Sequence, residues 1–224
     1  MHIEPGLVAG TKIALSYATA AGAGAYTLAL ASQAVRAGGW ASLGARAALC
    51  TALTYCFFEV LPHYPVGVSE VHLILGSTLF LVFGAAPAAI GLALGLLLQG
   101  LTFAPLDLPQ YGMNVTTLLV PLFALLAVAR RVVAPGTPYV DLRYREALAL
   151  SVTYQGGVVL WVAFWAVWGQ GFGATTLQSV LTFGGAYMLV VLLEPLVDLG
   201  VLAGAKAWRG LRTTGLVTPR LYAA

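Results

Sequence analysis

Long apolar runs, separated by short connections rich in glycine and proline, dominate the sequence. The strands of a membrane barrel are short and alternating, whereas these runs approach the 20 or so residues of a helix that crosses a bilayer. They predict one transmembrane domain, residues 1–224, with seven spans at about 11–34, 43–61, 71–83, 87–104, 113–133, 147–168 and 176–204. The third span is too short to cross alone, so we expect it to dip in from a loop or to begin below the surface.

Composition places the chain among membrane proteins. Its residues are 60% hydrophobic and only 8% charged, whereas about 25% of residues are charged in soluble domains. So little polar surface cannot cover a globule in water, and in lipid a helix satisfies its own backbone hydrogen bonds. The sequence therefore predicts an all-α integral membrane protein that passes the cell membrane several times.

The basic residues indicate the orientation. With seven spans, one set of connections and the tail carry Arg36, Arg46, Arg130, Arg131, Arg143, Arg145, Lys206, Arg209, Arg212 and Arg220. The alternate connections, 62–70, 105–112 and 169–175, contain no lysine or arginine. Cytoplasmic connections are rich in these residues, which predicts an external N-terminus and a cytoplasmic C-terminus. Lys12 breaks the pattern, and we expect its long side chain to snorkel.

Small residues recur every fourth position in the first two spans. They are Ala14, Ala18 and Gly22 in the first, and Gly44, Ala48 and Ala52 in the second. Such spacing allows helices to approach closely in a membrane. Two interpretations stay open, namely packing within the chain and a docking face for a partner membrane subunit.

The first two residues have the chemistry of a metal chelate. The bulky His2 is expected to block removal of Met1, so the free amine of Met1, the backbone nitrogen of His2 and its imidazole can bind one ion together. Planar nitrogen coordination favours Ni(II) or Cu(II), with Co(II) as a further candidate. His72 would supply a fourth nitrogen, and we expect Pro5-Gly6 to form a turn that folds the terminus back towards the bundle.

Three stretches in order carry a resemblance over about residues 1–130. MHIEPG resembles the MHIxxG start of the CbiM/NikM family, the substrate-binding (S) subunits of energy-coupling-factor importers for cobalt and nickel. GVSEVHLILGS resembles that family's Gly-Thr-Ser-Gly-His-Leu-Leu-Gly-Gly segment. LGLLLQGLTFAPLDLPQYGMNV is similar to its Leu-Leu-Leu-Gln-Ala-Leu-Leu-Phe run, which is followed by a turn and an asparagine.

The resemblance implies a seven-helix subunit whose N-terminus inserts into the bundle. Its metal ligands would be Met1, His2 and His72, and its motif places Ser69, Gln99 and Asn114 in supporting positions. The transported substrate would be Ni²⁺ or Co²⁺, with no organic cofactor. Its partners in the bacterial plasma membrane would be a membrane coupling (T) subunit and cytoplasmic ATPase (A) subunits, and a small accessory membrane subunit stays open.

The sequence also departs from the family pattern. Glu4-Pro5 stands where Pro-Asp or Met-Glu is commoner, and the spacing from Ser69 to His72 is one residue longer. These differences leave open the choice between nickel and cobalt and the choice between His72 and His63 as fourth ligand. Glu59 and Glu70 add carboxylates near the external mouth, where they would attract cations.

Other functions compete with the importer. The chain has no Gly-x-x-x-x-Gly-Lys-[Ser/Thr] loop, so ATP hydrolysis would belong to a separate subunit, and nothing indicates a nucleic-acid partner. An uncoupled divalent-metal carrier or channel with the same metal site stays open. An intramembrane hydrolase using Ser69 and His72 is disfavoured because no Gly-x-Ser-x-Gly elbow is present.

Overall fold

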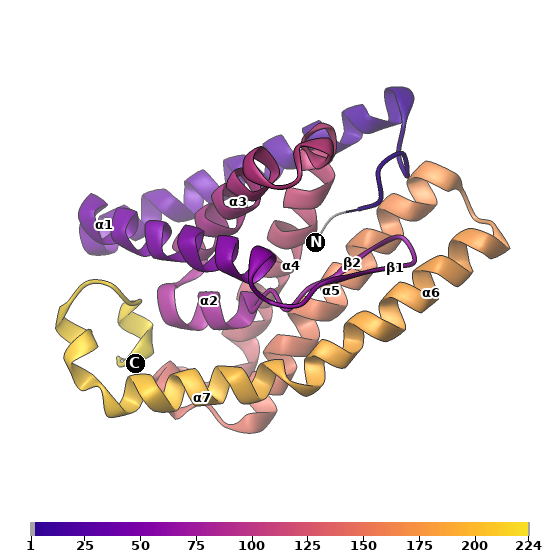
Figure 1. Cartoon of the computed structure of the whole chain (residues 1–224). Coiled ribbons are helices and arrows are strands. Elements are labelled where there is room, and N and C mark those ends of the chain that lie inside the picture. Colours follow the sequence, from indigo (N-terminus) through magenta and orange to yellow (C-terminus); the bar gives the residue numbers. More distant parts are fainter. Residues whose placement is uncertain (1–2, 224) are drawn as a thin grey trace.

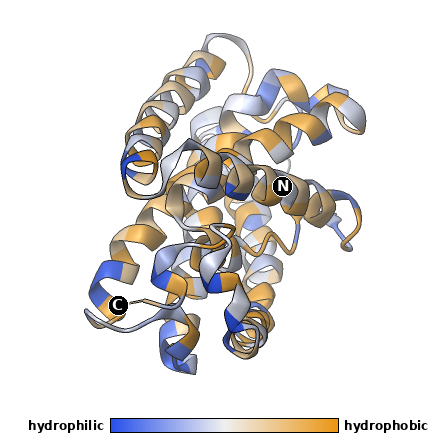
Figure 2. Cartoon of the chain, turned by 90° about the vertical axis from the view of Figure 1, so that its left-hand side faces the viewer, coloured by the Kyte–Doolittle hydropathy of each residue, from blue (hydrophilic) through white to orange (hydrophobic). Residues whose placement is uncertain are grey.

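The structure is a computed structural model that describes residues 3–223, and it is an all-α membrane protein. Five helical segments are long and apolar enough to cross a membrane: Gly10–Glu59, Ala85–Thr102, Pro105–Val132, Tyr144–Gln170 and Ala174–Ala207. Apolar residues run along these helices, and the most hydrophilic ones gather mainly at helix ends and connections (Figure 2).

Helix α1 (Ala14–Glu59), which follows a short 3₁₀ turn (Gly10–Ile13), consists of two arms. Gly39 separates them, with φ of 79° and ψ of 167°, a conformation that only glycine adopts easily. The chain reverses there, and the arms run back alongside each other (Figure 1). The expected spans 11–34 and 43–61 therefore fall in the two arms of one kinked helix.

A β-hairpin follows α1. Strands β1 (Tyr64–Val66) and β2 (Ser69–Val71) are antiparallel, with Val66 opposite Ser69, and a short irregular connection leads from β2 to α2 (Gly76–Phe83). The expected third span, 71–83, is thus a strand end, an irregular connection and a helix of only eight residues. The hairpin was not expected, because its strands have three residues each.

The middle of the bundle consists of three long helices. They are α3 (Ala85–Thr102), α4 (Tyr111–Val132) and α5 (Tyr144–Gln170), joined by 3₁₀ turns at Pro105–Gln110 and Tyr139–Asp141. Helix α4 is central, since it packs against α1, α3 and α5. All residues from 112 to 119 are buried, so its first two turns can present polar groups only to protein.

The last apolar stretch is broken in the middle. Helix α6 (Ala174–Met188) passes through a 3₁₀ turn (Leu189–Leu192) into α7 (Glu194–Ala207). Pro195 lies in the first turn of α7, where its missing N–H is tolerated, whereas inside a continuous helix it would remove a hydrogen bond. The expected span 176–204 therefore consists of two helices.

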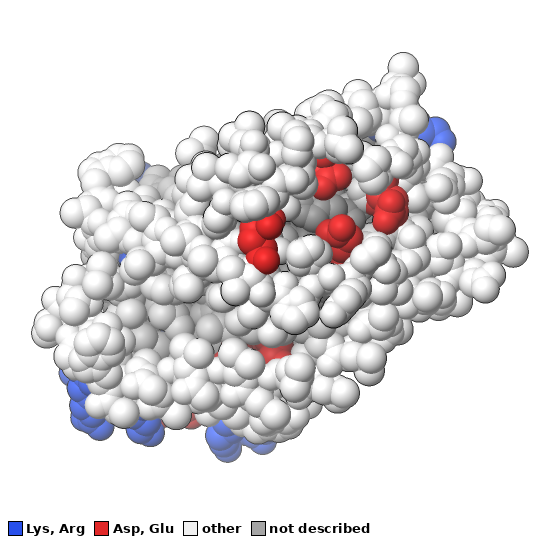
Figure 3. Space-filling view, in the orientation of Figure 1, with Lys and Arg blue, Asp and Glu red and all other residues white. Residues whose placement is uncertain are grey.

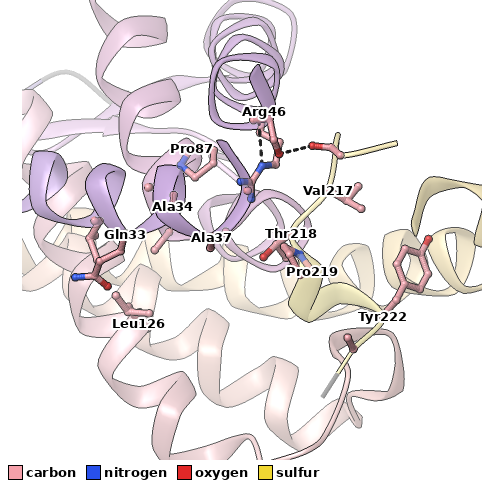
Figure 4. Close-up of a pocket in the computed structure, with 18 of the residues that line it drawn as sticks. Gln33, Ala34, Ala37, Arg46, Pro87, Leu126, Val217, Thr218, Pro219 and Tyr222 are labelled. Carbon is pink, nitrogen blue, oxygen red and sulfur yellow. Dashed lines mark hydrogen bonds between the residues drawn. The ribbon is translucent and has the colours of Figure 1, made fainter. Parts of the chain in front are cut away.

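The tail folds back on the bundle through two 3₁₀ turns, Arg209–Thr213 and Pro219–Leu221. The N–H of Thr218 donates to the carbonyl of Val82 (2.8 Å), and Arg46 donates to the carbonyl of Phe83 (2.9 Å), so both cover the end of α2. A cavity of about 470 Å³ lies between this tail and the kink of α1 (Figure 4). It shares no residue with the site described below.

The charged residues are separated on the surface. Acidic side chains gather near the middle of the face in Figure 3, and basic side chains lie mainly along its lower edge. The ammonium of Lys12 forms hydrogen bonds within the protein, because it donates to the carbonyls of Trp168 (3.1 Å) and Gly169 (3.0 Å) at the end of α5. A cation at this position also stabilises the negative end of the helix dipole.

The two stripes of small residues in α1 point away from the core. All six, Ala14, Ala18, Gly22, Gly44, Ala48 and Ala52, are exposed. Packing within the chain, one of the two interpretations of these stripes, is therefore wrong. Close contacts between helices are made instead by Gly91 and Gly95 of α3, whose backbones lie against Cys50 and Thr54.

Candidate metal site

The N-terminal segment enters the bundle and pairs with the hairpin. Ile3 is fully buried and forms an antiparallel bridge with Ser69, and the N–H of Glu4 donates to the carbonyl of Val68 (3.2 Å). The chain then turns at Pro5-Gly6, where the N–H of Leu7 donates to the carbonyl of Glu4 (3.1 Å). The turn expected there is confirmed.

Helix α4 holds the same segment from the other side. The backbone N–H of Ile3 donates to Oδ1 of Asn114, in the first turn of α4, over 3.0 Å. Both residues are buried, so this bond forms away from water. Met1 and His2 lie outside the described residues, but the peptide that follows His2 is fixed between β2 and α4.

His72 lies just beyond β2 and is 2% exposed. Its Nε2 is 2.9 Å from a carboxylate oxygen of Glu70, and its ring contacts Phe58, with 4.9 Å between centroids. His63 stacks on it almost in parallel, at 4.9 Å and 10°, but is exposed. A carboxylate on one ring nitrogen is the usual way in which proteins orient a histidine that binds metal.

The other residues that the sequence indicated, Ser69, Asn114 and Gln99, are all buried. Ser69 is fully buried beside Ile3, and Asn114 contacts the same residue. Gln99 is also buried, near the end of α3, and no described residue hydrogen-bonds to its Oε1. The structure therefore brings Ser69, Asn114 and the N-terminal segment together. Gln99 lies on α3 between Leu96 and Gly100, which line a small gap together with Asn114.

An acidic cavity opens beside this segment. It has a volume of about 360 Å³, and its lining includes Glu4, Glu70 and Asp107. Acidic side chains gather on this face of the molecule (Figure 3). Three carboxylates around one opening raise the local concentration of cations. Sequence reasoning identified Glu70 but not Glu4 or Asp107, although all three belong to segments assigned to the same side of the membrane.

The N-terminal segment is also packed closely against the end of α5. A methyl group on Gly169 would lie 2.0 Å from the carbonyl oxygen of Leu7, so only glycine fits there. Leu7 and Val8 are both buried. The segment is thus held on three sides, by the hairpin, by α4 and by α5.

Comparison with known proteins agrees with this arrangement. Residues 2–209 match the CbiM family, described as the cobalt uptake substrate-specific transmembrane region. The chain belongs to the CbiM family. The fold of this CbiM-family chain resembles a crystal structure described as that of a truncated transition metal transporter. The TM-score is 0.69 and the identity 17%, over 93% of this chain and 99% of that one. No curated protein matches.

Membership confirms the resemblance seen in the sequence and sets the class of function. The CbiM-family chain is a multi-pass membrane protein of metal uptake, with a metal ion as substrate. The family is a component of a transporter, which disfavours the hydrolase alternative.

Proposed function

We propose that the chain is the substrate-binding subunit of an ATP-driven importer and captures Ni²⁺ or Co²⁺ at an N-terminal site of nitrogen ligands. The observation that carries this proposal is the burial of Ile3 between Ser69 and Asn114. A terminus loose in solvent would not bury its third residue completely. The ligands in this proposal are the amine of Met1, the backbone nitrogen and imidazole of His2, and the imidazole of His72.

His72 is the better fourth ligand of the two candidate histidines. It is buried and oriented by Glu70, whereas His63 is exposed on the outer face of the ring stack. Since Nε2 is engaged by Glu70, we assign metal coordination to Nδ1. Ser69 and Asn114 would act as positioning residues, because both contact Ile3, one residue after the chelating His2.

The acidic cavity supports the capture step. Glu4 and Glu70 line it and lie within the same two segments as the proposed ligands. A hydrated divalent cation would collect there before it exchanges water for nitrogen ligands. Carboxylates bind Ni²⁺ and Co²⁺ less strongly than nitrogen donors do, so the cavity would concentrate the ion without retaining it.

The orientation and the number of passes are part of the proposal. Each arm of α1, 14–38 and 40–59, reaches the roughly 20 residues that cross a bilayer. Counting the arms separately, and taking residues 71–83 together as one pass because α2 alone is too short to cross, gives seven passes. The basic ends would then be cytoplasmic and the acidic cavity external, which agrees with the positive-inside rule.

The exposed stripes of small residues on α1 would contact the membrane coupling subunit. A methyl group added to Gly22 or Gly44 would meet no atom within 4 Å, so a partner helix can approach the backbone closely at both positions. ATP hydrolysis would then be supplied by cytoplasmic ATPase subunits, whose contacts would lie at the basic end.

Uptake of ⁶³Ni²⁺ or ⁵⁷Co²⁺ into proteoliposomes tests this function. The purified chain alone should bind the ion without accumulating it, and uptake should need a coupling subunit, ATPase subunits and ATP. Accumulation by the chain alone, equal to that of the full assembly, would establish an uncoupled carrier instead.

A further inference from the structure

A second cluster of polar groups lies inside the bundle, where α2, α5 and α7 meet. Glu194 and Asp198 are one turn apart on α7, and both are fully buried. Asp198 accepts hydrogen bonds from Ser77 (2.8 Å) and Thr78 (2.5 Å) of α2. Glu194 accepts through Oε2 from Ser151 (2.5 Å) and Gln155 (2.8 Å) of α5.

These hydrogen bonds leave several oxygens of the cluster without a partner. The second carboxylate oxygen of Glu194, Oε1, is buried and has no described partner within hydrogen-bond geometry, although the hydroxyl and the backbone N–H of Ser77, in the first turn of α2, both lie near this carboxylate. The same holds for Oε1 of Gln155, whose amide nitrogen is bound to Glu194. Two pure acceptors in a buried place need a donor or a cation, because leaving them bare costs free energy.

Two tyrosines complete the cluster. The hydroxyls of Tyr154 on α5 and Tyr187 on α6 are buried without a hydrogen-bond partner among the described residues. Both lie within electrostatic reach of Glu194. Every unpartnered atom named here is thus an oxygen, two of them pure acceptors and two of them hydroxyls that can donate or accept. Together with Ser77 and Thr78 they resemble the ligands of a hard or borderline cation.

The charge of the cluster points the same way. None of the ion pairs formed within residues 3–223 includes Glu194 or Asp198, so the two carboxylates have no arginine or lysine to balance them. Intramembrane acidic residues are costly and mark ion pathways. One divalent cation would neutralise the pair completely.

We propose that Glu194 and Asp198, with oxygens of Ser77, Gln155 and the two tyrosines, form a second site that binds a divalent cation inside the membrane. The identity of the cation rests on the proposed function. The cation would be the transported ion after it has left the nitrogen ligands. Ser77 follows His72 by only five residues, so the two sites are joined by the short connection into α2. Oxygen ligands bind Co²⁺ and Ni²⁺ more weakly than nitrogen ligands, as a site for onward release requires.

Mn²⁺ is the probe, because it prefers oxygen ligands. Its binding is measured by electron paramagnetic resonance on the full chain carrying one extra residue before Met1, which removes the nitrogen chelate. One Mn²⁺ should bind each chain, and Glu194→Gln or Asp198→Asn should weaken binding at least tenfold. Asp141→Asn is the matched control, since Asp141 pairs with Lys206, about two turns beyond Asp198 on α7 and outside the cluster, and it should bind normally.

Ser77→Ala keeps the test decisive if a carboxylate variant fails to fold, and it should weaken Mn²⁺ binding several-fold. The proposal is overturned if the extended chain binds no Mn²⁺, which is the result expected when the carboxylates hold only protons. Binding that survives all three substitutions overturns it as well. If the native chain fails to bind Ni²⁺ while Mn²⁺ binding still depends on Glu194, the N-terminal function fails and the second site stands.

Discussion

The backbone N–H of Ile3 donates a 3.0 Å hydrogen bond to Oδ1 of Asn114, joining positions 111 residues apart in the chain. This bond holds the peptide that follows His2 against the first turn of α4. Ile3 also pairs with Ser69, three residues before His72. The N-terminal chelate and its fourth ligand would therefore be positioned through the same buried residue.

Replacing Asn114 should loosen the N-terminus. Asn114→Ala leaves the buried N–H of Ile3 without an acceptor, which costs about 1–3 kcal/mol. The affinity for Ni²⁺ should fall by roughly 10–100-fold, the usual effect of losing a residue that supports a metal site. Calorimetry measures the affinity and thermal unfolding measures the stability. Asn114→Asp, which keeps an acceptor oxygen, should lose less, and equal losses for both variants would argue against this hydrogen bond.

The two histidines should respond differently to substitution. His72→Ala removes the proposed fourth nitrogen and should lower Ni²⁺ affinity at least tenfold, whereas His63→Ala removes only a stacked, exposed ring and should change it little. Titration calorimetry on both variants decides between them. The opposite order of effects would make His63 the ligand.

The contact between Gly169 and Leu7 can be tested against a control in the same helix. Gly169→Ala places a methyl group 2.0 Å from the carbonyl oxygen of Leu7, so we expect a destabilisation of about 1–3 kcal/mol and weaker metal binding. Gly156→Ala, also on α5, meets nothing within 4 Å and should be neutral or stabilising. Identical melting temperatures for the two variants would contradict the close packing described here.

The acidic cavity should act on the rate of capture. Asp107→Asn and Glu4→Gln remove charges from its lining and should slow Ni²⁺ association several-fold at low ionic strength. The effect should shrink at about 1 M salt, where charges more than about 3 Å apart are screened. Stopped-flow measurements give the rates, and Asp141→Asn serves as the control. If neither substitution changes the association rate of Ni²⁺ at low salt, the cavity does not attract the ion.

Much of the fold could be predicted from sequence because apolar length and charge are local signals. The apolar runs indicated an all-α membrane protein, and Pro5-Gly6 indicated the turn that sends the N-terminus back. The β-hairpin and the break before Pro195 were missed, because three-residue strands and a single proline hardly change hydropathy.

The sequence predicted the parts of the candidate site that depend on the type of side chain, but not the parts that depend on backbone contacts. His72 and Asn114 belong to recognisable motifs. Ile3 instead contacts Asn114 and Ser69 through its backbone, and the type of its side chain does not predict these contacts. Glu194 and Asp198 were overlooked, although two carboxylates four residues apart in an apolar stretch are a signal by themselves. Their partners on α2 and α5 could not be predicted, because they lie 39 or more residues away along the chain.

The central claim is that the free amine of Met1 is a metal ligand, and one residue added before Met1 tests it directly. Calorimetry and absorption spectroscopy with Ni²⁺ compare the native and extended chains, with thermal unfolding as the check on folding. The native chain should bind one Ni²⁺ tightly and show the absorption of a planar nitrogen site, and the folded extended chain should bind at least a hundredfold more weakly. Unchanged affinity and an unchanged spectrum in the extended chain would contradict the N-terminal chelate.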